Sequence, residues 1–283
     1  MRKQTTQMLA DGFVFLEGPR WHEGYLWFSD MWGMKVYKMS AAGKRSVVCE
    51  VPQRPSGLGF LPDGTLLVVS MAERKLLKLV NDKLELHADL SGLTGGDVND
   101  IVTDAQGRSY VGNFGYDLFS GAEQQPADLC LVEANGTARV VASDLVFPNG
   151  SVIKDEGKTL VVAETWASRL AAFDIAPDGS LSNRRVYAAL PDRLPDGICL
   201  DAEGAIWVAD ARGAELLRVR DGGKITDRVA LPAGRHAFAC MLGGADRRDL
   251  YVCTAEGSGP VMAAKMTAGI DVVRASVPGA GLP

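Results

Sequence analysis

The sequence EGPRWHEGYLWFSD at residues 17–30 recurs in varied form along the whole chain. Each copy begins with a small polar residue, a carboxylate or, once, Phe. An apolar run, a turn rich in Asp and Gly, and a second β-rich run follow, a pattern that predicts a β-hairpin. The later copies are SGLGFLPDGTLLVVSM (56–71), NDIVTDAQGRSYVGNF (99–114), NGSVIKDEGKTLVVAET (149–165), DGICLDAEGAIWVADA (196–211) and a degenerate FACMLGGADRRDLYVCTA (238–255).

The period of this repeat predicts a six-bladed β-propeller. The copies start 39 to 50 residues apart, and a four-stranded propeller blade takes about 40–50 residues. A β-sandwich also has short strands, but it does not explain one motif that returns six times. We therefore expect an all-β fold of six four-stranded antiparallel blades, forming a single domain over residues 1–283. Residues 5–14 are expected to pair with the last blade, and the tail at 270–283 to be loose.

Composition narrows the classes of partner and location. The 283-residue chain carries a net charge of −5 and has no Lys/Arg-rich run, which argues against nucleic acid. No stretch approaches the roughly 18 apolar residues of a membrane span, and residues 1–10 lack a signal-peptide core. The five cysteines are scattered without CxxC spacing, which is typical of buried reduced thiols. We expect a cytoplasmic protein that binds neither nucleic acid nor membrane, with its oligomeric state open.

The first residues of the six repeats should meet around the propeller axis. The first strand of every blade lines the axis, and all first strands start at the same rim. In chain order these axial residues are Glu17, Ser56, Asn99, Asn149, Asp196 and Phe238. Taken singly, Asn149-Gly and Asp196-Gly are common turn dipeptides. Four oxygen-bearing residues in one register instead indicate a binding ring, in which Ser56 and Phe238 least resemble ligands.

Two carboxylates and two amides in a partly buried ring favour a bound cation. Clustered carboxylates repel one another, and one would take up a proton unless a cation sits among them. Oxygen donors favour a hard divalent ion, Ca²⁺ first, with Mg²⁺, Mn²⁺, Zn²⁺ and Fe²⁺ as alternatives.

The motifs LEGPRW, PNG and PDG, at these spacings, resemble those of the senescence-marker-protein/gluconolactonase family over essentially the whole chain. The resemblance implies that Glu17, Asn149 and Asp196 bind one divalent cation and that Asn99 lies beside the metal or substrate. It also implies hydrolysis of lactones, often sugar lactones. Sugar-lactone members often carry Arg two residues before the third-blade Asn. This chain has Asp97 there, which puts sugar-lactone specificity in doubt.

Residues just after the second strand of each repeat should form the pocket wall, because that strand runs back to the same rim. Trp32, Tyr116 and Trp166 would then make an aromatic mouth with Phe114. Our hypothesis is metal-assisted hydrolysis, in which Asp196 contacts the metal and acts as general base for water. Asn99 and Asn113 would orient substrate or water, and His236 is an outside candidate for proton transfer.

Other functions stay open at this point. The chain has no G-x-S-x-G motif, which argues against a serine hydrolase. The same scaffold could hydrolyse an aryl ester or a non-sugar ring, which Asp97 and the aromatic mouth favour. It could also be a non-catalytic propeller that binds a metal or ligand.

Overall fold

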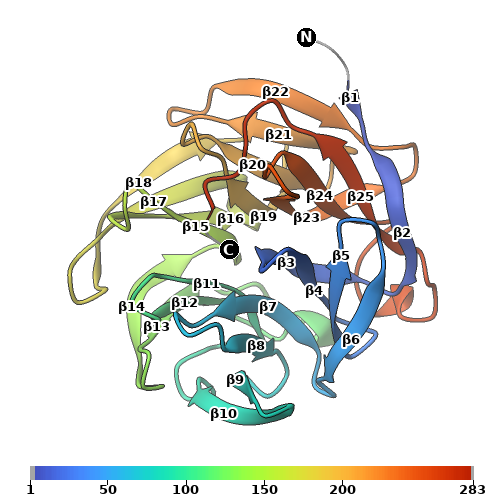
Figure 1. Ribbon diagram of the computed structural model, residues 1–283. Helices are drawn as coiled ribbons and strands as arrows, with labels where there is room; N and C mark the ends of the chain where they lie inside the picture. Colours follow the sequence, from blue (N-terminus) through green and yellow to red (C-terminus); the bar gives the residue numbers. More distant parts are fainter. Residues whose placement is uncertain (1–3, 282–283) are drawn as a thin grey trace.

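The computed structural model describes residues 4–281, which form six antiparallel sheets around one axis (Figure 1). The predicted all-β, six-bladed propeller is therefore confirmed. From the axis outward, blade 1 contains β3 (Leu16–His22), β4 (Tyr25–Asp30), β5 (Lys35–Ser40) and β6 (Arg45–Glu50). Blade 2 contains β7 (Pro55–Phe60), β8 (Leu66–Ser70), β9 (Lys75–Val80) and β10 (Lys83–Asp89). Blade 3 contains β11 (Val98–Thr103), β12 (Ser109–Asn113), β13 (Ala127–Val132) and β14 (Ala138–Leu145).

The second half of the chain repeats the arrangement. Blade 4 contains β15 (Pro148–Lys154), β16 (Thr159–Glu164), β17 (Arg169–Ile175) and β18 (Leu181–Ala189). Blade 5 contains β19 (Pro195–Leu200), β20 (Ile206–Asp210), β21 (Glu215–Val219) and β22 (Ile225–Ala230). Blade 6 contains β23 (His236–Gly243), β24 (Asp249–Ala255), β25 (Ala268–Arg274) and β2 (Gln7–Phe13). Three short 3₁₀ helices are η1 (Leu118–Ser120), η2 (Thr165–Ala167) and η3 (Pro260–Met262).

The N-terminal segment closes the ring, as predicted. β2 pairs with β25 in antiparallel fashion and becomes the outer strand of blade 6, while β1 (Gln4–Thr5) runs parallel to β22 of blade 5. Thr6, which lies between β1 and β2 in the sequence, donates its hydroxyl proton to Asp271 on β25 in a 2.6 Å hydrogen bond. The expectation of a loose tail from residue 270 is wrong for its first part, because β25 continues to Arg274.

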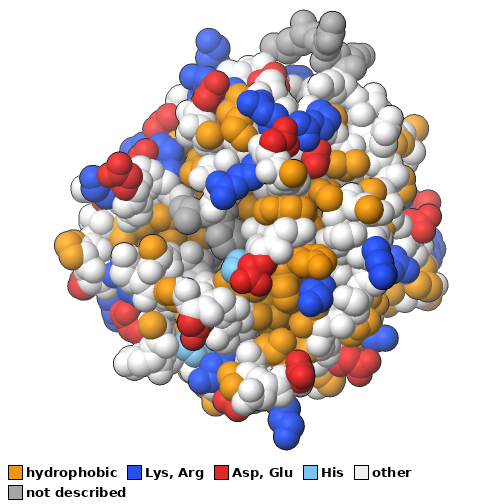
Figure 2. Space-filling model, viewed as in Figure 1, with side chains coloured by type: hydrophobic (Ala, Val, Ile, Leu, Met, Phe, Trp, Pro, Cys, Tyr) orange, Lys and Arg blue, Asp and Glu red, His pale blue; other side chains and the backbone are white. Residues whose placement is uncertain are grey.

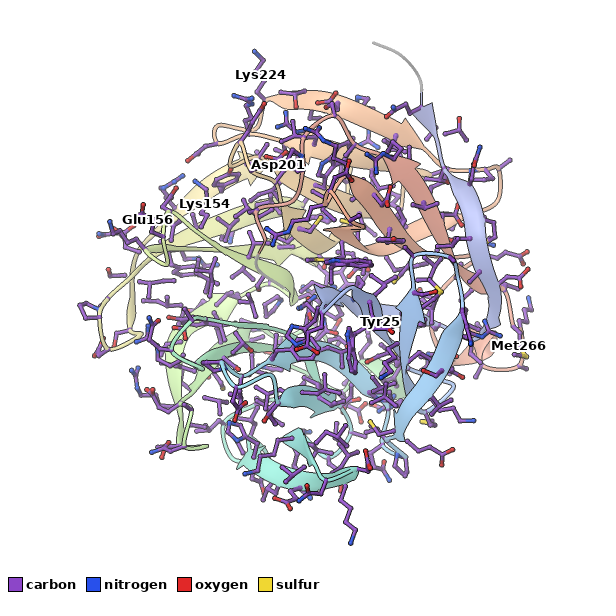
Figure 3. All side chains as sticks on the ribbon, viewed as in Figure 1. Tyr25, Lys154, Glu156, Asp201, Lys224 and Met266 are labelled. Carbon is purple, nitrogen blue, oxygen red and sulfur yellow. The ribbon has the colours of Figure 1, made fainter. Side chains whose placement is uncertain are left out.

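The apolar core lies between neighbouring blades. Leu58 and Val68 of blade 2 belong to one buried cluster with Val36 of blade 1, so each sheet covers the face of the next. In blades 2, 3, 5 and 6 the turn between the first and second strands uses an Asp side chain to accept backbone N–H groups, as Asp201 does from Glu203 and Ala205. Figure 3 labels Asp201, and Lys154 and Glu156 at the equivalent turn of blade 4.

Polar side chains at the ends of second strands fix the loops that lead into the inner strands. Asp30 accepts hydrogen bonds from the backbone of Val14 and Phe15, Glu164 from Val146, and Asp210 from Leu194. These loops border the axial end at which the inner strands begin. Buried carboxylates therefore hold the rim of the candidate site in place.

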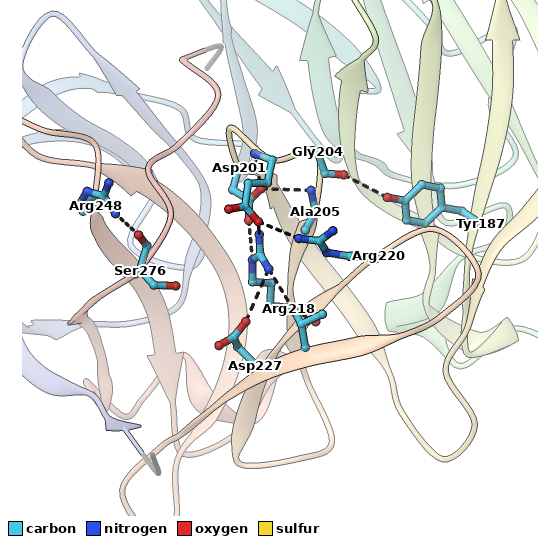
Figure 4. A network of polar contacts seen from close by, with 11 residues as sticks. Tyr187, Asp201, Gly204, Ala205, Arg218, Arg220, Asp227, Arg248 and Ser276 are labelled. Atoms are coloured by element: carbon cyan, nitrogen blue, oxygen red, sulfur yellow. Dashed lines mark hydrogen bonds and ion pairs between the residues drawn. The ribbon is translucent and has the colours of Figure 1, made fainter. Parts of the chain in front are cut away.

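Blade 5 also contains a buried ionic network. Arg218 on β21 donates to Asp201 at 2.6 Å and to Glu203 at 2.9 Å, and it lies 3.6 Å from Asp227 (Figure 4).

On the face seen in Figure 2, acidic and basic side chains alternate around the rim with hydrophobic atoms between them. Within residues 4–281, no helix has the length and apolar character needed to cross a membrane. A cytoplasmic location stays a prediction.

Candidate functional site

Each axial residue lies at a β-bulge in its inner strand. Five of them are the second residue of their strand, and Phe238 is the third. In every blade the pairing of the inner with the second strand shifts register at this point, for example between Pro148 and Ser151 and between Pro195 and Ile198. A bulge releases a residue from regular pairing and redirects its side chain. Six bulges at one rim therefore turn the axial residues toward a common space.

The glycines that follow the axial residues bring the inner strands close together. A Cβ atom on Gly150 would lie 2.5 Å from the Ile198 nitrogen of the next blade, and one on Gly197 would lie 2.5 Å from the Ala239 Cβ. Asn149-Gly150 and Asp196-Gly197 thus stand inside strands β15 and β19. The alternative interpretation of these dipeptides as turns is wrong.

Glu17, Asn99, Asn149 and Asp196 line one cavity of about 190 Å³ at the axis, with Phe238 beside them. The Asn149 side-chain N–H donates to the Thr165 hydroxyl at 3.3 Å, which in turn donates to the Pro195 carbonyl at 2.8 Å. This chain of bonds engages the side-chain N–H₂ group of Asn149 and leaves its side-chain oxygen free to face the cavity. Ser56 stands outside the cavity lining and donates to the Asn99 side-chain oxygen at 3.3 Å.

The two axial carboxylates are buried next to further negative charge. Burial, and then the charges of Asp196 and Asp100, raise the pKa of Glu17 well above its usual range. Burial and the charge of Asp100 likewise raise the pKa of Asp196. The Oδ1 atom of Asp196 is buried and accepts no hydrogen bond from any residue of the described chain. The buried carboxylates of Glu17 and Asp196 therefore lack a positive charge between them that would offset their burial.

Asp100 and Arg20 complete the charge balance, and sequence reasoning missed both. Arg20, three residues beyond Glu17 on β3, donates to Asp100 on β11 at 3.0 Å and also bonds the Ile101 carbonyl. Glu17, Asp196 and Asp100 carry three negative charges and Arg20 one positive charge, so the fully ionised group has a net charge of −2. A signal was present: Asp100 occupies the position at which four of the other five repeats have Gly.

These residues fit a hard divalent cation. The donors are oxygen atoms, one carboxylate oxygen is buried without a partner, and a charge of +2 neutralises the group. Within residues 4–281 there is no cluster of three or more His, Cys, Asp and Glu side chains suited to a metal. The candidate set therefore differs from such clusters, since it combines two carboxylates with amide oxygens.

The cavity wall is aromatic. Phe114 and Phe147 stack with ring centroids 4.6 Å apart, Trp166 packs against Phe147 at 5.3 Å, and Phe119 lies 5.3 Å from Trp32. Trp32 and Trp166, which we predicted, line the cavity. Met31 and Ala211, which directly follow second strands as predicted for the wall, line it too. The cavity is also lined by residues that were not predicted to form its wall, namely Phe15, Leu118, Phe119, Phe147 and Leu194. Leu118 and Phe119 belong to η1, which begins after an Asp117 cap in the longest loop of blade 3.

Four of the predicted substrate residues do not line this cavity. Asn113 is fully buried, and its amide bonds the backbone of Asp128 and Gly115. Asp97 pairs with Arg54 at 2.5 Å. Tyr116 lies near Phe147, with ring centroids 6.4 Å apart. His236 begins β23, and its buried Nδ1 has no hydrogen-bond partner within residues 4–281.

A second cavity, of about 310 Å³, opens at the other end of the inner strands. Arg20, Ser151, Cys199 and Met241 are among its lining residues. All five cysteines are free, and Cys199, Cys240 and Cys253 are buried as predicted. The axial carboxylates Glu17 and Asp196 line the first cavity and are absent from the lining of the second.

Comparison with known proteins agrees with this architecture. Regucalcin of Danio rerio is 29% identical over 257 residues, covering 84% of this chain and 82% of that protein. The 6-deoxy-6-sulfogluconolactonase of Pseudomonas putida is 24% identical over 245 residues, with coverage of 84% and 82%. The crystal structure of a calcium-binding protein, regucalcin, from Agrobacterium tumefaciens superposes with a TM-score of 0.81 at 21% identity, covering 99% of this chain and 97% of that one. The SMP-30/gluconolactonase/LRE-like region matches residues 15–256, and the chain therefore belongs to this family.

Proposed function

We propose that this protein is a divalent-metal-dependent lactonase, which opens an intramolecular ester with water. The observation that carries the proposal is the buried pair Glu17 and Asp196 at the floor of an aromatic cavity, inside a group with a net charge of −2. Family membership supports it, since one relative is named as a sulfogluconolactonase and one structural neighbour as a calcium-binding protein.

Glu17, Asn149 and Asp196 would hold the cation through their side-chain oxygens, with Ca²⁺ as the first candidate. When bound, such an ion supplies Lewis-acid polarisation of an ester carbonyl. The hydrogen bonds from Asn149 to Thr165 and from Thr165 to the Pro195 carbonyl favour one orientation of the Asn149 amide. This second layer of contacts limits how far that ligand oxygen can move.

The remaining steps belong to the side chains of the floor. Asp196 would accept a proton from the attacking water at its carboxylate, and its unpartnered Oδ1 is available for contact. Asn99 would position the water or the substrate, because its oxygen is engaged by Ser56 while its N–H₂ group stays available. The aromatic wall would keep bulk water away from the ring that opens.

The test is the variant Asp196→Asn, assayed for lactone hydrolysis by acid release and for bound metal by elemental analysis. We expect a loss of turnover of at least a hundredfold, which is within the range for a general base, with much of the metal retained. Asp221→Asn, at a half-exposed residue in an outer turn, is the matched control and should keep parental activity. Undiminished hydrolysis by Asp196→Asn would refute the assignment, and metal-dependent melting without turnover by the parent would indicate a non-catalytic binding protein.

We also propose a cytoplasmic location, which the five free cysteines favour.

A further inference from the structure

We infer that the substrate is a small lactone with an alkyl or aryl body, and that polyhydroxylated sugar lactones are poor substrates. This inference rests on the proposed function and names the substrate class of the same site. It follows from the chemistry of the cavity wall, which is separate from the carboxylate and amide floor.

The wall presents a continuous aromatic surface. Trp32 packs on Phe119, Phe119 lies 5.8 Å from Phe114, Phe114 stacks on Phe147, and Phe147 packs on Trp166. These five side chains come from the four loops that follow β4, β12, β14 and β16. Such a surface gains by burying an apolar substituent and offers π-faces to an aryl ring.

The same wall has few groups that could bind sugar hydroxyls. Among the described residues that line the cavity, only Thr165, Ser258 and the indole N–H groups of Trp32 and Trp166 add side-chain hydrogen-bonding atoms to those of the four floor residues. Thr165 already donates its hydroxyl proton to the Pro195 carbonyl and accepts from Asn149. Each substrate hydroxyl buried without a partner would lower affinity roughly ten- to hundredfold, so several would exclude a sugar ring.

Charged substituents find no better support. Arg54 contacts this wall, with its guanidinium 5.1 Å from the Trp32 ring and 4.5 Å from the Phe119 ring. Asp97 neutralises it at 2.5 Å, so the Arg54 side chain buttresses the aromatic wall. The cavity volume of about 190 Å³ is below the roughly 300 Å³ at which drug-sized sites begin. It suits two fused rings, or one ring with a short alkyl chain.

The test compares γ-nonalactone and dihydrocoumarin with glucono-δ-lactone in the Ca²⁺-loaded protein. We expect kcat/KM to be at least a hundredfold higher for the two apolar lactones. In parallel, calorimetry measures binding of a γ-alkyl lactam and of gluconolactam, whose amide bonds resist hydrolysis. Preference for the sugar compound in either assay overturns the inference.

The two assays also separate the inference from the proposed function. Tight binding of the alkyl lactam without hydrolysis of any lactone contradicts the lactonase proposal and leaves the ligand class standing. If the protein neither binds the lactams nor hydrolyses any lactone, both the inference and the proposed function are contradicted.

Trp166 supplies a variant that should fold, because its side chain is 42% exposed at the cavity mouth. Trp166→Ala should lower kcat/KM for γ-nonalactone about tenfold with little effect on glucono-δ-lactone, and Trp166→Phe should recover most of the loss. Val186→Ala, at an exposed residue on β18 outside the cavity lining, should match the parent. Equal losses for both lactones in Trp166→Ala would count against an apolar binding role.

Discussion

Replacing Asp100 by Asn should weaken cation binding by changing charge alone. Asn retains an Oδ1 acceptor, so the hydrogen bonds from Arg20 and from the Ile101 N–H can both persist. The axial group then carries −1 in place of −2. At an effective dielectric constant of about 20, a unit charge taken as roughly 8 Å from a divalent ion contributes about 4 kcal/mol. Water at the open mouth reduces this to about 2 kcal/mol, or roughly thirtyfold in Kd.

The assay is calorimetric titration of Ca²⁺ into chelator-treated protein at low ionic strength. Arg20→Met makes the net charge more negative, from −2 to −3, and should tighten binding, whereas the double variant Arg20→Met/Asp100→Asn returns it to −2. The double variant should bind within a few-fold of the parent, although it lacks the ion pair. Thermal melting of each variant checks its fold. A Kd for Asp100→Asn within twofold of the parent, or no recovery in the double variant, would refute the charge argument.

Two further predictions concern the scaffold. Glu164 is fully buried and binds Arg169 and Arg184. Although burial opposes the effect, these arginines and the Val146 N–H lower the pKa of Glu164. Its contribution to stability is therefore present above pH 4.5, the unfolded value, and is lost as the pH falls through the folded value. Glu164→Gln should cost about 3 kcal/mol at pH 7, with the difference in urea denaturation shrinking in acid; a difference independent of pH would count against this origin. Gly150→Ala should push β19 outward, lower stability by about 1–3 kcal/mol and weaken Ca²⁺ binding in calorimetry. Gly92→Ala, which meets open space, is its control, and equal behaviour of the two variants would contradict the close-packing argument.

The fold could be predicted because one hairpin motif recurs along the sequence at the spacing of propeller blades. Six copies of one hairpin motif determine both the number of blades and the register of the inner strands, and therefore which residues face the axis. The same register predicts that Glu17, Asn99, Asn149 and Asp196 lie together, and all four line one cavity. Residues 5–14 were expected to pair with the last blade, because a propeller must join its ends, and β2 does so. The repeat did not determine which strand closes the ring.

The cavity wall could be predicted only in part, because loop conformation is not periodic. Trp32 and Trp166 follow second strands directly, and their position was clear from the repeat. Phe119 reaches the cavity through a 3₁₀ turn inside an irregular loop, which no repeat copy describes. Asn113 occupies a position equivalent to Asp30 and Asp210, and its side-chain oxygen accepts the backbone N–H of Gly115 as their carboxylates accept those of Gly33 and Arg212.

The residues that differ from blade to blade determine the chemistry at the axis. Six identical blades would place six like groups around it, and such a ring of charges would repel itself. Here blades 1 and 5 contribute carboxylates, blades 3 and 4 amides, and blade 6 the Phe238 ring, so the floor has a polar side and an apolar side. At the following position, Gly57 leaves room for Asp100, because a Cβ there would lie 2.8 Å from the Asp100 Oδ1. Arg20 of blade 1 can thus pair with Asp100 of blade 3. Without that pair the glycine pattern alone would pack the blades, but it would not set the charge that a divalent ion must match.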